Sequence, residues 1–192
     1  MAVLYPRGTI FTQLYHGFCE DVKKMSGGRL VIEDLYDGEG FKEVDVLPVV
    51  RSGMFQMGAP YMALHVGEVA AGVVELMLPG APTTPFEMRA LFHHAGWKDV
   101  LRKAYAKANV YWLGEYYQPG TYVLTKKPIE KIEDFAKMKI RCPGAYGKMM
   151  RNLGATPVVI NFSEVYTALA TGVVDGVDGC NIIDHRDAKF YE

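Results

Sequence analysis

The chain has 192 residues, of which 49% are hydrophobic and 22% are charged, and its formal net charge at neutral pH is −1. This composition is that of a globular protein of one large or two small domains, and the balanced charge argues against nucleic acid or an anionic membrane surface as a partner. No apolar run reaches the roughly 20 residues that cross a bilayer, and the three cysteines have neither metal-ligand nor redox spacing.

The first part of the chain is predicted to be mostly helical, with two short strands. Apolar residues recur three and four apart in "TIFTQLYHGFCEDVKKM", which is typical of an amphipathic helix, and two glycines follow it. A longer helical region begins at Thr84, a good N-cap before proline, and is expected to break near Gly96. In chain order we expect a helix in 9–28, a strand in 29–36, a short helix in 43–53, a buried strand from residue 54 that runs into a loop at Pro60, and helices in 84–109.

From residue 110 onward, strands and helices alternate. This alternation predicts βαβ units, a mainly parallel sheet and an α/β class. We place a boundary near Gly120, which gives a first lobe at 1–121 and a second lobe at 122–192. The expected elements are one or two strands in 110–125, a helical turn in 127–138, a strand at 139–142, a helix at 145–153, a strand at 156–161, a helix at 163–172 with Ser163 as its N-cap, and a strand at 173–177.

The stretch "KIRCPGAYGKMMRNLG" combines a cation with a sharp turn and a helix start. Arg141 lies at the carboxyl end of its predicted strand, where open α/β sheets bind ligands. Pro143 ends the strand, and Gly144 allows a ligand to approach the backbone. A helix start and a guanidinium both favour an anion such as a small carboxylate. The alternative is an arginine that pairs with a neighbouring acid on the surface.

Three segments resemble one known family, the periplasmic substrate-binding proteins of tripartite ATP-independent periplasmic (TRAP) transporters, of the dicarboxylate-binding type. These segments are "KIEDFAKMKIRCPG", "LGATPVVINFSEVYTALATGVVDG", and the pair "MSGGRLVIEDL" and "VVRSGMFQMG". The resemblance covers nearly the whole chain. Because members of this family extend further, we expect the sequence to be incomplete at both ends and its second lobe to be truncated.

The resemblance implies a two-lobed α/β protein that binds a small organic acid in the cleft between its lobes. It also implies a periplasmic location, although the first residues lack a signal-peptide pattern. The implied partners are the membrane permease subunits of a transporter, with no nucleic acid. No catalytic residue, cofactor or metal ion is expected.

The resemblance also implies a set of ligand-binding residues. Arg141 matches the arginine that holds the ligand carboxylate, and Phe162 matches an aromatic position against the ligand. Asp178 and Asn181 fall where polar contacts occur in the family, although "VDGCN" departs from the usual pattern. Tyrosines suit an apolar or aromatic ligand tail, and the candidates are Tyr61, Tyr117 and Tyr122. Ordinary packing is the alternative for each tyrosine.

One departure from the family bears on the ligand. Several dicarboxylate and sialic-acid binders have a second arginine on the strand where this chain has Tyr122. A second carboxylate would then lie unpaired in a dry cleft, which is costly. We therefore expect a monocarboxylate rather than a dicarboxylate.

A function of another class is a cytosolic α/β enzyme that acts on a carboxylate. Its reactive group would be Cys142 or a histidine. However, no histidine has a recognisable spacing to Cys142, and a buried inert thiol fits the pattern better. The adjacent His93 and His94 point in different directions on a helix and form a poor metal pair.

Overall fold

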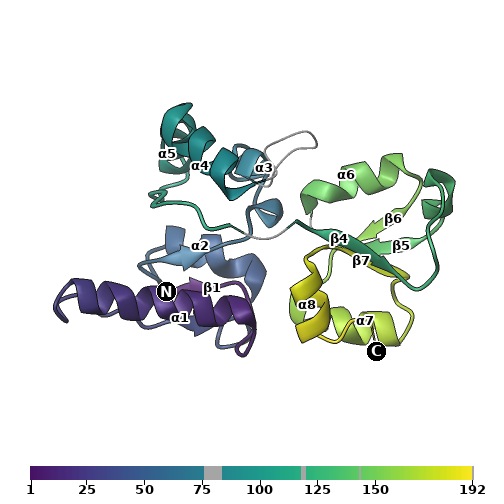
Figure 1. Ribbon diagram of the computed structural model, residues 1–192, viewed down its shortest axis with the longest axis horizontal. Helices are drawn as coiled ribbons and strands as arrows, with labels where there is room; N and C mark the ends of the chain where they lie inside the picture. Colours follow the sequence, from purple (N-terminus) through teal and green to yellow (C-terminus); the bar gives the residue numbers. More distant parts are fainter. Residues whose placement is uncertain (76–83, 118–119, 143, 192) are drawn as a thin grey trace.

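The computed structural model describes residues 1–75, 84–117, 120–142 and 144–191. They form two α/β lobes, each built around its own sheet: the described residues before 118 lie in one lobe and those from 120 onward in the other (Figure 1). The predicted two-lobed α/β class is confirmed. Within the described residues, no helix combines the length and the apolar character that a membrane span requires.

The first lobe contains a small parallel sheet of order β2-β1-β3. Its strands are short, and both β2 and β3 pair with β1 in parallel. A helix, α1, connects β1 to β2, as a parallel pairing requires. The elements of this part are β1 (Ala2–Val3), α1 (Ile10–Met25), β2 (Leu35–Tyr36), the 3-10 turn η1 (Glu43–Asp45), α2 (Val46–Arg51) and β3 (Gly58–Ala59).

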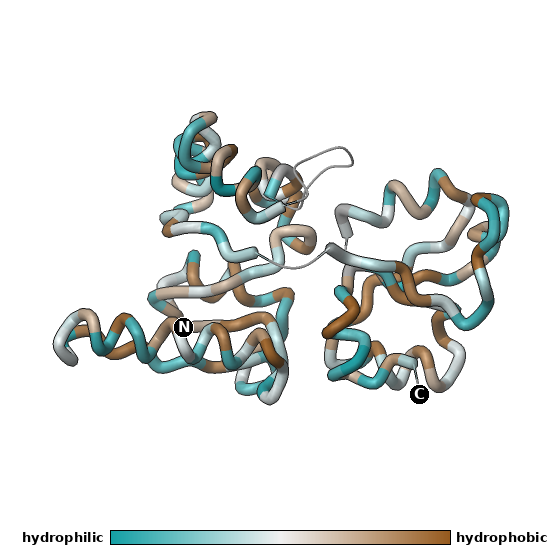
Figure 2. Tube along the Cα trace, in the orientation of Figure 1, coloured by the Kyte–Doolittle hydropathy of each residue, from teal (hydrophilic) through white to brown (hydrophobic). Residues whose placement is uncertain are grey.

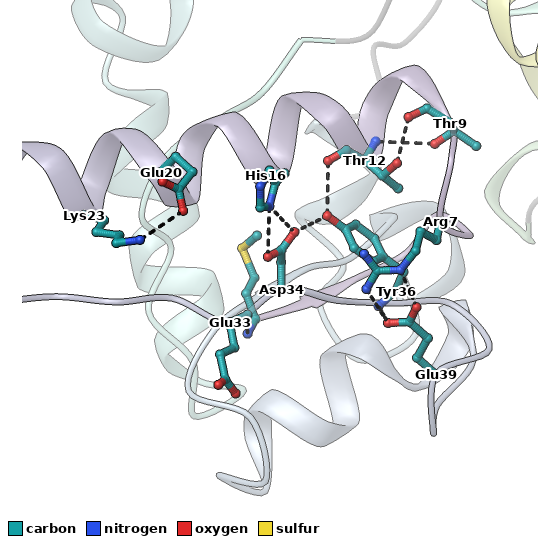
Figure 3. A network of polar contacts seen from close by, with 11 residues as sticks. Arg7, Thr9, Thr12, His16, Glu20, Lys23, Glu33, Asp34, Tyr36 and Glu39 are labelled. Carbon is teal, nitrogen blue, oxygen red and sulfur yellow. Dashed lines mark hydrogen bonds and ion pairs between the residues drawn. The ribbon is translucent and has the colours of Figure 1, made fainter. Parts of the chain in front are cut away.

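Polar contacts fix the start of α1 against the chain that follows it (Figure 3). Thr9 caps the helix by accepting a hydrogen bond from the amide of Thr12. The Tyr36 hydroxyl donates to the Thr12 carbonyl oxygen at 3.2 Å, and Arg7 makes two hydrogen bonds to the Glu39 carboxylate. The loop before α1 is thereby held in place, and this loop faces the second lobe, as described below.

The rest of the first lobe is helical. Thr84 is the N-cap of α4, as predicted, and it also forms a capping box with Glu87. Gly96, with φ of 80°, separates α4 from α5 as expected. Stacked Phe92 and Trp112 rings, 5.7 Å apart, lie in the core of this region. The elements are η2 (Met62–Leu64), α3 (Gly72–Glu75), α4 (Pro85–His94) and α5 (Trp97–Ala106).

The second lobe has a four-stranded sheet of order β4-β7-β5-β6. β5 pairs in parallel with both β6 and β7, and β4 pairs antiparallel with β7. The two central strands, β7 and β5, carry both apolar and polar residues (Figure 2), and their apolar residues Val177 and Ile140 are fully buried. The elements are β4 (Tyr122–Thr125), η3 (Ile132–Phe135), β5 (Lys139–Arg141), α6 (Gly144–Asn152), β6 (Thr156–Val158), η4 (Phe162–Glu164), α7 (Val165–Ala170), β7 (Gly176–Cys180) and α8 (Ile182–Asp187).

Gly176 allows β7 to lie closely between β4 and β5. A Cβ atom at this position would come within 2.6 Å of the Leu124 carbonyl oxygen and 2.8 Å of Thr125 Cγ2. Any side chain would therefore push the strands apart. The glycine that ends "VVDG" is thus explained by packing within the sheet.

Two local predictions were wrong. The strand expected at 29–36 forms only at Leu35–Tyr36, because β1 pairs only through Ala2 and Val3 and leaves the earlier residues without a neighbouring strand. Ser163 does not cap its helix; it lies within η4, and its side chain is hydrogen-bonded to Asp37 of the first lobe instead.

Candidate functional site

Arg141 is the last residue of β5, and its side chain is buried at 4% exposure. Its Nε donates to the Ile160 carbonyl oxygen at 2.9 Å. Its Nη1 lies 3.5 Å from the Asp178 carbonyl oxygen and 3.8 Å from Cys180 Sγ. Two of the three guanidinium nitrogens, the arms Nε and Nη1, are thus held by the loop after β6 and by β7. The second lobe therefore fixes the direction in which the third arm, Nη2, points.

The third arm points to the first lobe, where it meets Glu43. Glu43 Oε1 lies 3.5 Å from Arg141 Nη2, and both side chains are buried. The same oxygen accepts a hydrogen bond from the Phe162 amide at 3.2 Å. The Glu43 amide donates to Asp37 Oδ1 at 2.8 Å, which fixes η1 locally. A buried ion pair therefore joins the two lobes at the predicted arginine.

Burial raises the pKa of Glu43 to about 7. The positive charge of Arg141 opposes this shift, and the nearby Asp37 carboxylate adds to it. The desolvation of a carboxylate outweighs one ion pair here because the pair is long and the surroundings are dry. Glu43 consequently changes its charge close to neutral pH.

A small cavity lies at this junction, with a free volume of about 20 Å³. A volume of this size holds about one water molecule. A ligand the size of an organic acid therefore needs the two lobes to separate or the lining side chains to move. The lining residues are Leu4, Tyr5, Glu43 and Tyr61 from the first lobe and Arg141, Phe162 and Asp184 from the second.

Aromatic rings enclose one side of the cavity. Tyr5 packs edge to face against Phe162 across the lobes, with ring centroids 5.7 Å apart, and it stacks on Phe11 within its own lobe. Burial raises the pKa values of Tyr5 and Tyr61 well above their ordinary value, so both phenols are neutral. These residues offer an apolar wall with polar tips, as ligand pockets often do.

A second, more open groove of about 360 Å³ lies beside this cavity. The loop before α1 forms one side of it, and η4 with the end of the chain forms the other. Phe162 lines both the groove and the cavity, so its ring separates them. The lining residues are Pro6, Arg7, Gly8, Thr9, Phe162, Ser163, Tyr166, Asp187, Ala188 and Phe190.

The structure brings three of the predicted site residues together, namely Arg141, Phe162 and Tyr61. Two predicted tyrosines do not line the cavity. Tyr122 on β4 is 58% exposed, and the Tyr117 hydroxyl donates to Glu115 while its ring packs against the helical core of the first lobe.

The two polar candidates in and directly after β7 support the site rather than face it. Asp178 contributes its backbone carbonyl to the guanidinium of Arg141. Asn181 is the N-cap of α8: its amide oxygen accepts from the amides of Ile183 and Asp184, and its Nδ2 donates to the Asp184 carboxylate. The side chain of Asn181 is thus fully occupied in ending the loop and starting the helix.

Glu43, Tyr5 and Asp184 belong to the site but were not predicted. Burial raises the pKa of Asp184 to about 6, although the hydrogen bond from the Asn181 amide opposes the shift. The spacing Asn181-x-x-Asp184 is that of a capping box and could have placed Asp184 beside the cleft. Glu43 and Tyr5 have no such signal, because each is brought to the site by the packing of the two lobes.

The backbone near Gly144 approaches the first lobe. A Cβ atom at Gly144 would lie 3.3 Å from the Ala63 carbonyl oxygen. The close approach predicted for a ligand at this glycine is therefore made, in this structure, by the turn η2. The start of α6 packs on the other lobe.

The thiol of Cys142 is buried, and burial raises its pKa to about 11. The negative charge of Asp178 adds to this shift. A thiol with such a pKa has almost no thiolate at neutral pH and is a poor nucleophile. This environment does not favour the enzyme hypothesis.

Comparison with known proteins identifies the family. Residues 2–192 match the family model DctP, described as bacterial extracellular solute-binding protein, family 7. The chain is 28% identical over 184 residues to a monocarboxylate 2-oxoacid-binding periplasmic protein of Nostoc, with 88% of this chain and 48% of that protein covered. It is 31% identical over 167 residues to a C4-dicarboxylate-binding periplasmic protein of Rhodobacter capsulatus, with 84% and 49% covered.

Solved structures show the same fold. A marine metagenome TRAP solute-binding protein, crystallised with co-purified pyroglutamate, superimposes with a TM-score of 0.86 at 24% identity. The match covers 100% of this chain and 62% of that one. This chain spans about half the length of the curated relatives it matches. The extent of the family match shows that the chain belongs to family 7 of the bacterial extracellular solute-binding proteins, the DctP family of TRAP transporters.

Proposed function

We propose that the protein is the extracytoplasmic solute-binding subunit of a TRAP transporter and that it captures a small organic monocarboxylate for a membrane permease. The family is that of periplasmic solute-binding proteins rather than enzymes. The observation that carries the proposal is the buried guanidinium of Arg141, which the second lobe holds by two arms and presents to the first lobe. A guanidinium held in this way can bind a carboxylate with defined geometry.

The proposed binding step is closure of the lobes over the ligand. Arg141 anchors the carboxylate, and Phe162 and Tyr61, with Tyr5, enclose the rest of the molecule. Closure excludes water and strengthens the ion pair, as in other hinged binding proteins. Release to the permease then requires the lobes to open again.

The charge of the cavity favours a monocarboxylate. Among the described residues that line it, Arg141 is the one cation, and Glu43 and Asp184 are acids. A second ligand carboxylate would lie beside these acids without a cation of its own, and a buried unpaired charge is costly. The relative from Nostoc is named for monocarboxylate 2-oxoacids and the metagenome protein for pyroglutamate, which agrees with this preference, whereas the relative from Rhodobacter is named for C4-dicarboxylates.

Calorimetry with a panel of organic acids tests the proposal. We expect saturable binding of a monocarboxylate without turnover, and at least a 100-fold loss of affinity in Arg141→Ala, because a buried charge-assisted pair is removed. Arg151→Ala, an exposed arginine of the same lobe, serves as the control and should bind normally. If no acid binds, or if Arg141→Ala binds as well as the wild type, the proposal is wrong.

A further inference from the structure

Glu43 occupies the position beside Arg141 that a ligand carboxylate would need. The inference drawn from this contact rests on the proposed function. Nε of the guanidinium is engaged by the Ile160 carbonyl, and Nη1 faces the Asp178 carbonyl. The arm that remains, Nη2, is the one beside Glu43 Oε1. A ligand carboxylate that binds this arm must therefore occupy the space beside or in place of the Glu43 carboxylate.

Two carboxylates cannot share this position while both are ionised. The cavity has room for about one water molecule, so a ligand carboxylate would lie in contact with Glu43. Like charges at contact distance in a dry site force one of the pair to take up a proton. A ligand of low pKa stays ionised on the guanidinium, so the proton goes to Glu43.

The other charged groups around Glu43 favour its neutral form. Asp37 and Glu164 both repel a negative charge on it, and Arg141 opposes them. Asp184, from α8, lines the same cavity. Lys42 lies near but pairs with Glu164, at 3.7 Å, on the surface. The neighbouring phenols of Tyr5 and Tyr61 are neutral.

We propose that Glu43 is a proton-binding residue of the ligand site, and that a carboxylate binding to Arg141 displaces the Glu43 carboxylate, which takes up one proton from solvent. The new O–H of Glu43 can then donate a hydrogen bond to an acceptor on the ligand. One carboxylate and one proton enter together, so the net charge of the closed site does not change. The site thereby selects acids that bring one negative charge.

The pKa of Glu43, about 7, sets the range in which this coupling is visible. Below pH 6 the proton is already bound, and the ligand meets a neutral competitor. Above pH 7 the proton must be taken from solvent, so the affinity falls with rising pH. We expect the affinity for a carboxylate to be about tenfold weaker at pH 8 than at pH 6.

Acetate is a suitable probe, because it is the simplest monocarboxylate and is ionised throughout this range. Its affinity is measured by thermal-shift titration at pH 6 and pH 8, with chloride at equal ionic strength as the reference. We expect the tenfold change in the wild type, less than a twofold change in Glu43→Gln, and no saturable binding in Glu43→Gln combined with Arg141→Met. Glu133→Gln, the same change at an exposed acid of η3 far from the cavity lining, should retain the pH dependence.

A second measurement needs no variant. Calorimetry of acetate binding to the wild type in two buffers of different ionisation enthalpy gives the number of protons taken up. We expect about one proton per acetate at pH 8 and almost none at pH 6. No uptake at pH 8, or a pH dependence that persists in Glu43→Gln, overturns the proposal.

These outcomes are distinct from failure of the proposed function. If organic acids bind through Arg141 but without proton uptake, the solute-binding function stands and the role of Glu43 is refuted. If acetate fails to bind Glu43→Gln even at high millimolar concentration, Arg141 does not accept a carboxylate once its competitor is neutral, and the coupling is refuted as well. Proton-coupled acetate binding supports the coupling, whichever acid the panel identifies.

Discussion

The two lobes hold the central guanidinium in different ways. The second lobe uses backbone carbonyls of Ile160 and Asp178, which have no charge to lose and are fixed by the sheet. The first lobe uses the side chain of Glu43, which titrates near neutral pH and lies on a short turn. The second lobe therefore holds the guanidinium through backbone groups that do not titrate, and the first lobe holds it through a side chain whose charge depends on pH.

Removing the arginine should break this arrangement most severely. In Arg141→Met the Glu43 carboxylate is left buried without its cation, so we expect a loss of about 3–5 kcal/mol in the free energy of unfolding at pH 8. The loss should be smaller at pH 5, where Glu43 is protonated. Urea unfolding of the variant and the wild type at both pH values measures this, and equal losses would contradict a buried charged pair.

The free energy of unfolding should depend on pH through Glu43, the contact that the first lobe makes to the guanidinium. The pKa of Glu43 in the folded protein is raised from 4.5 to about 7, so the folded state binds this proton more tightly than the unfolded state. The stabilisation is complete below pH 4.5 and is lost as the pH rises through 7, amounting to about 3 kcal/mol.

Glu43→Gln isolates this contribution, because Asp184 and Glu75 also have raised pKa values and titrate near pH 6 in both proteins. Urea unfolding at a series of pH values gives the free energy of unfolding of each protein. The wild-type value minus the variant value should fall between about pH 5 and pH 8. A flat difference would show that Glu43 is not the titrating group.

The rigid frame of the second lobe can be tested at Gly176. Gly176→Ala places a methyl group within 2.6 Å of the Leu124 carbonyl oxygen, so we expect the stability to fall by about 1–3 kcal/mol through overpacking. Gly17→Ala is the control: nothing lies within 4 Å of its Cβ position in α1, and the helix should gain up to about 1 kcal/mol. Equal effects at the two positions, measured by thermal unfolding, would argue against close packing of β4 and β7.

The smallest effect is expected at the rim between the lobes. Ser163→Ala removes the hydrogen bond to Asp37, which also accepts from the Glu43 amide, and should cost about 1 kcal/mol. Ser52→Ala, an exposed serine at the end of α2 that bonds within its own helix turn, should change the stability by less than about 0.5 kcal/mol. Unfolding curves for both variants measure the difference. If Ser163→Ala costs no more than Ser52→Ala, the hydrogen bond between Ser163 and Asp37 does not stabilise the contact between the lobes.

Much of the second lobe was predictable because its signals are local. A strand that ends in Arg141, a turn, a helix closed by Gly154 and a second strand follow from periodicity and from proline and glycine positions. The same holds for the N-cap at Thr84 and the break at Gly96. The strand expected over 29–36 failed because a strand needs a neighbour, and the extent of β1 is a property of the fold.

The sequence by itself determined the class, the family and the position of the arginine at a strand end, since each depends on residues close together in the chain. Only the tertiary structure decided what the arginine faces. Glu43 contacts the Phe162 amide across 119 residues, and such a contact depends on how two lobes pack rather than on any spacing in the sequence. The same packing removes water from Glu43, and that desolvation gives an ordinary carboxyl group a pKa near neutrality.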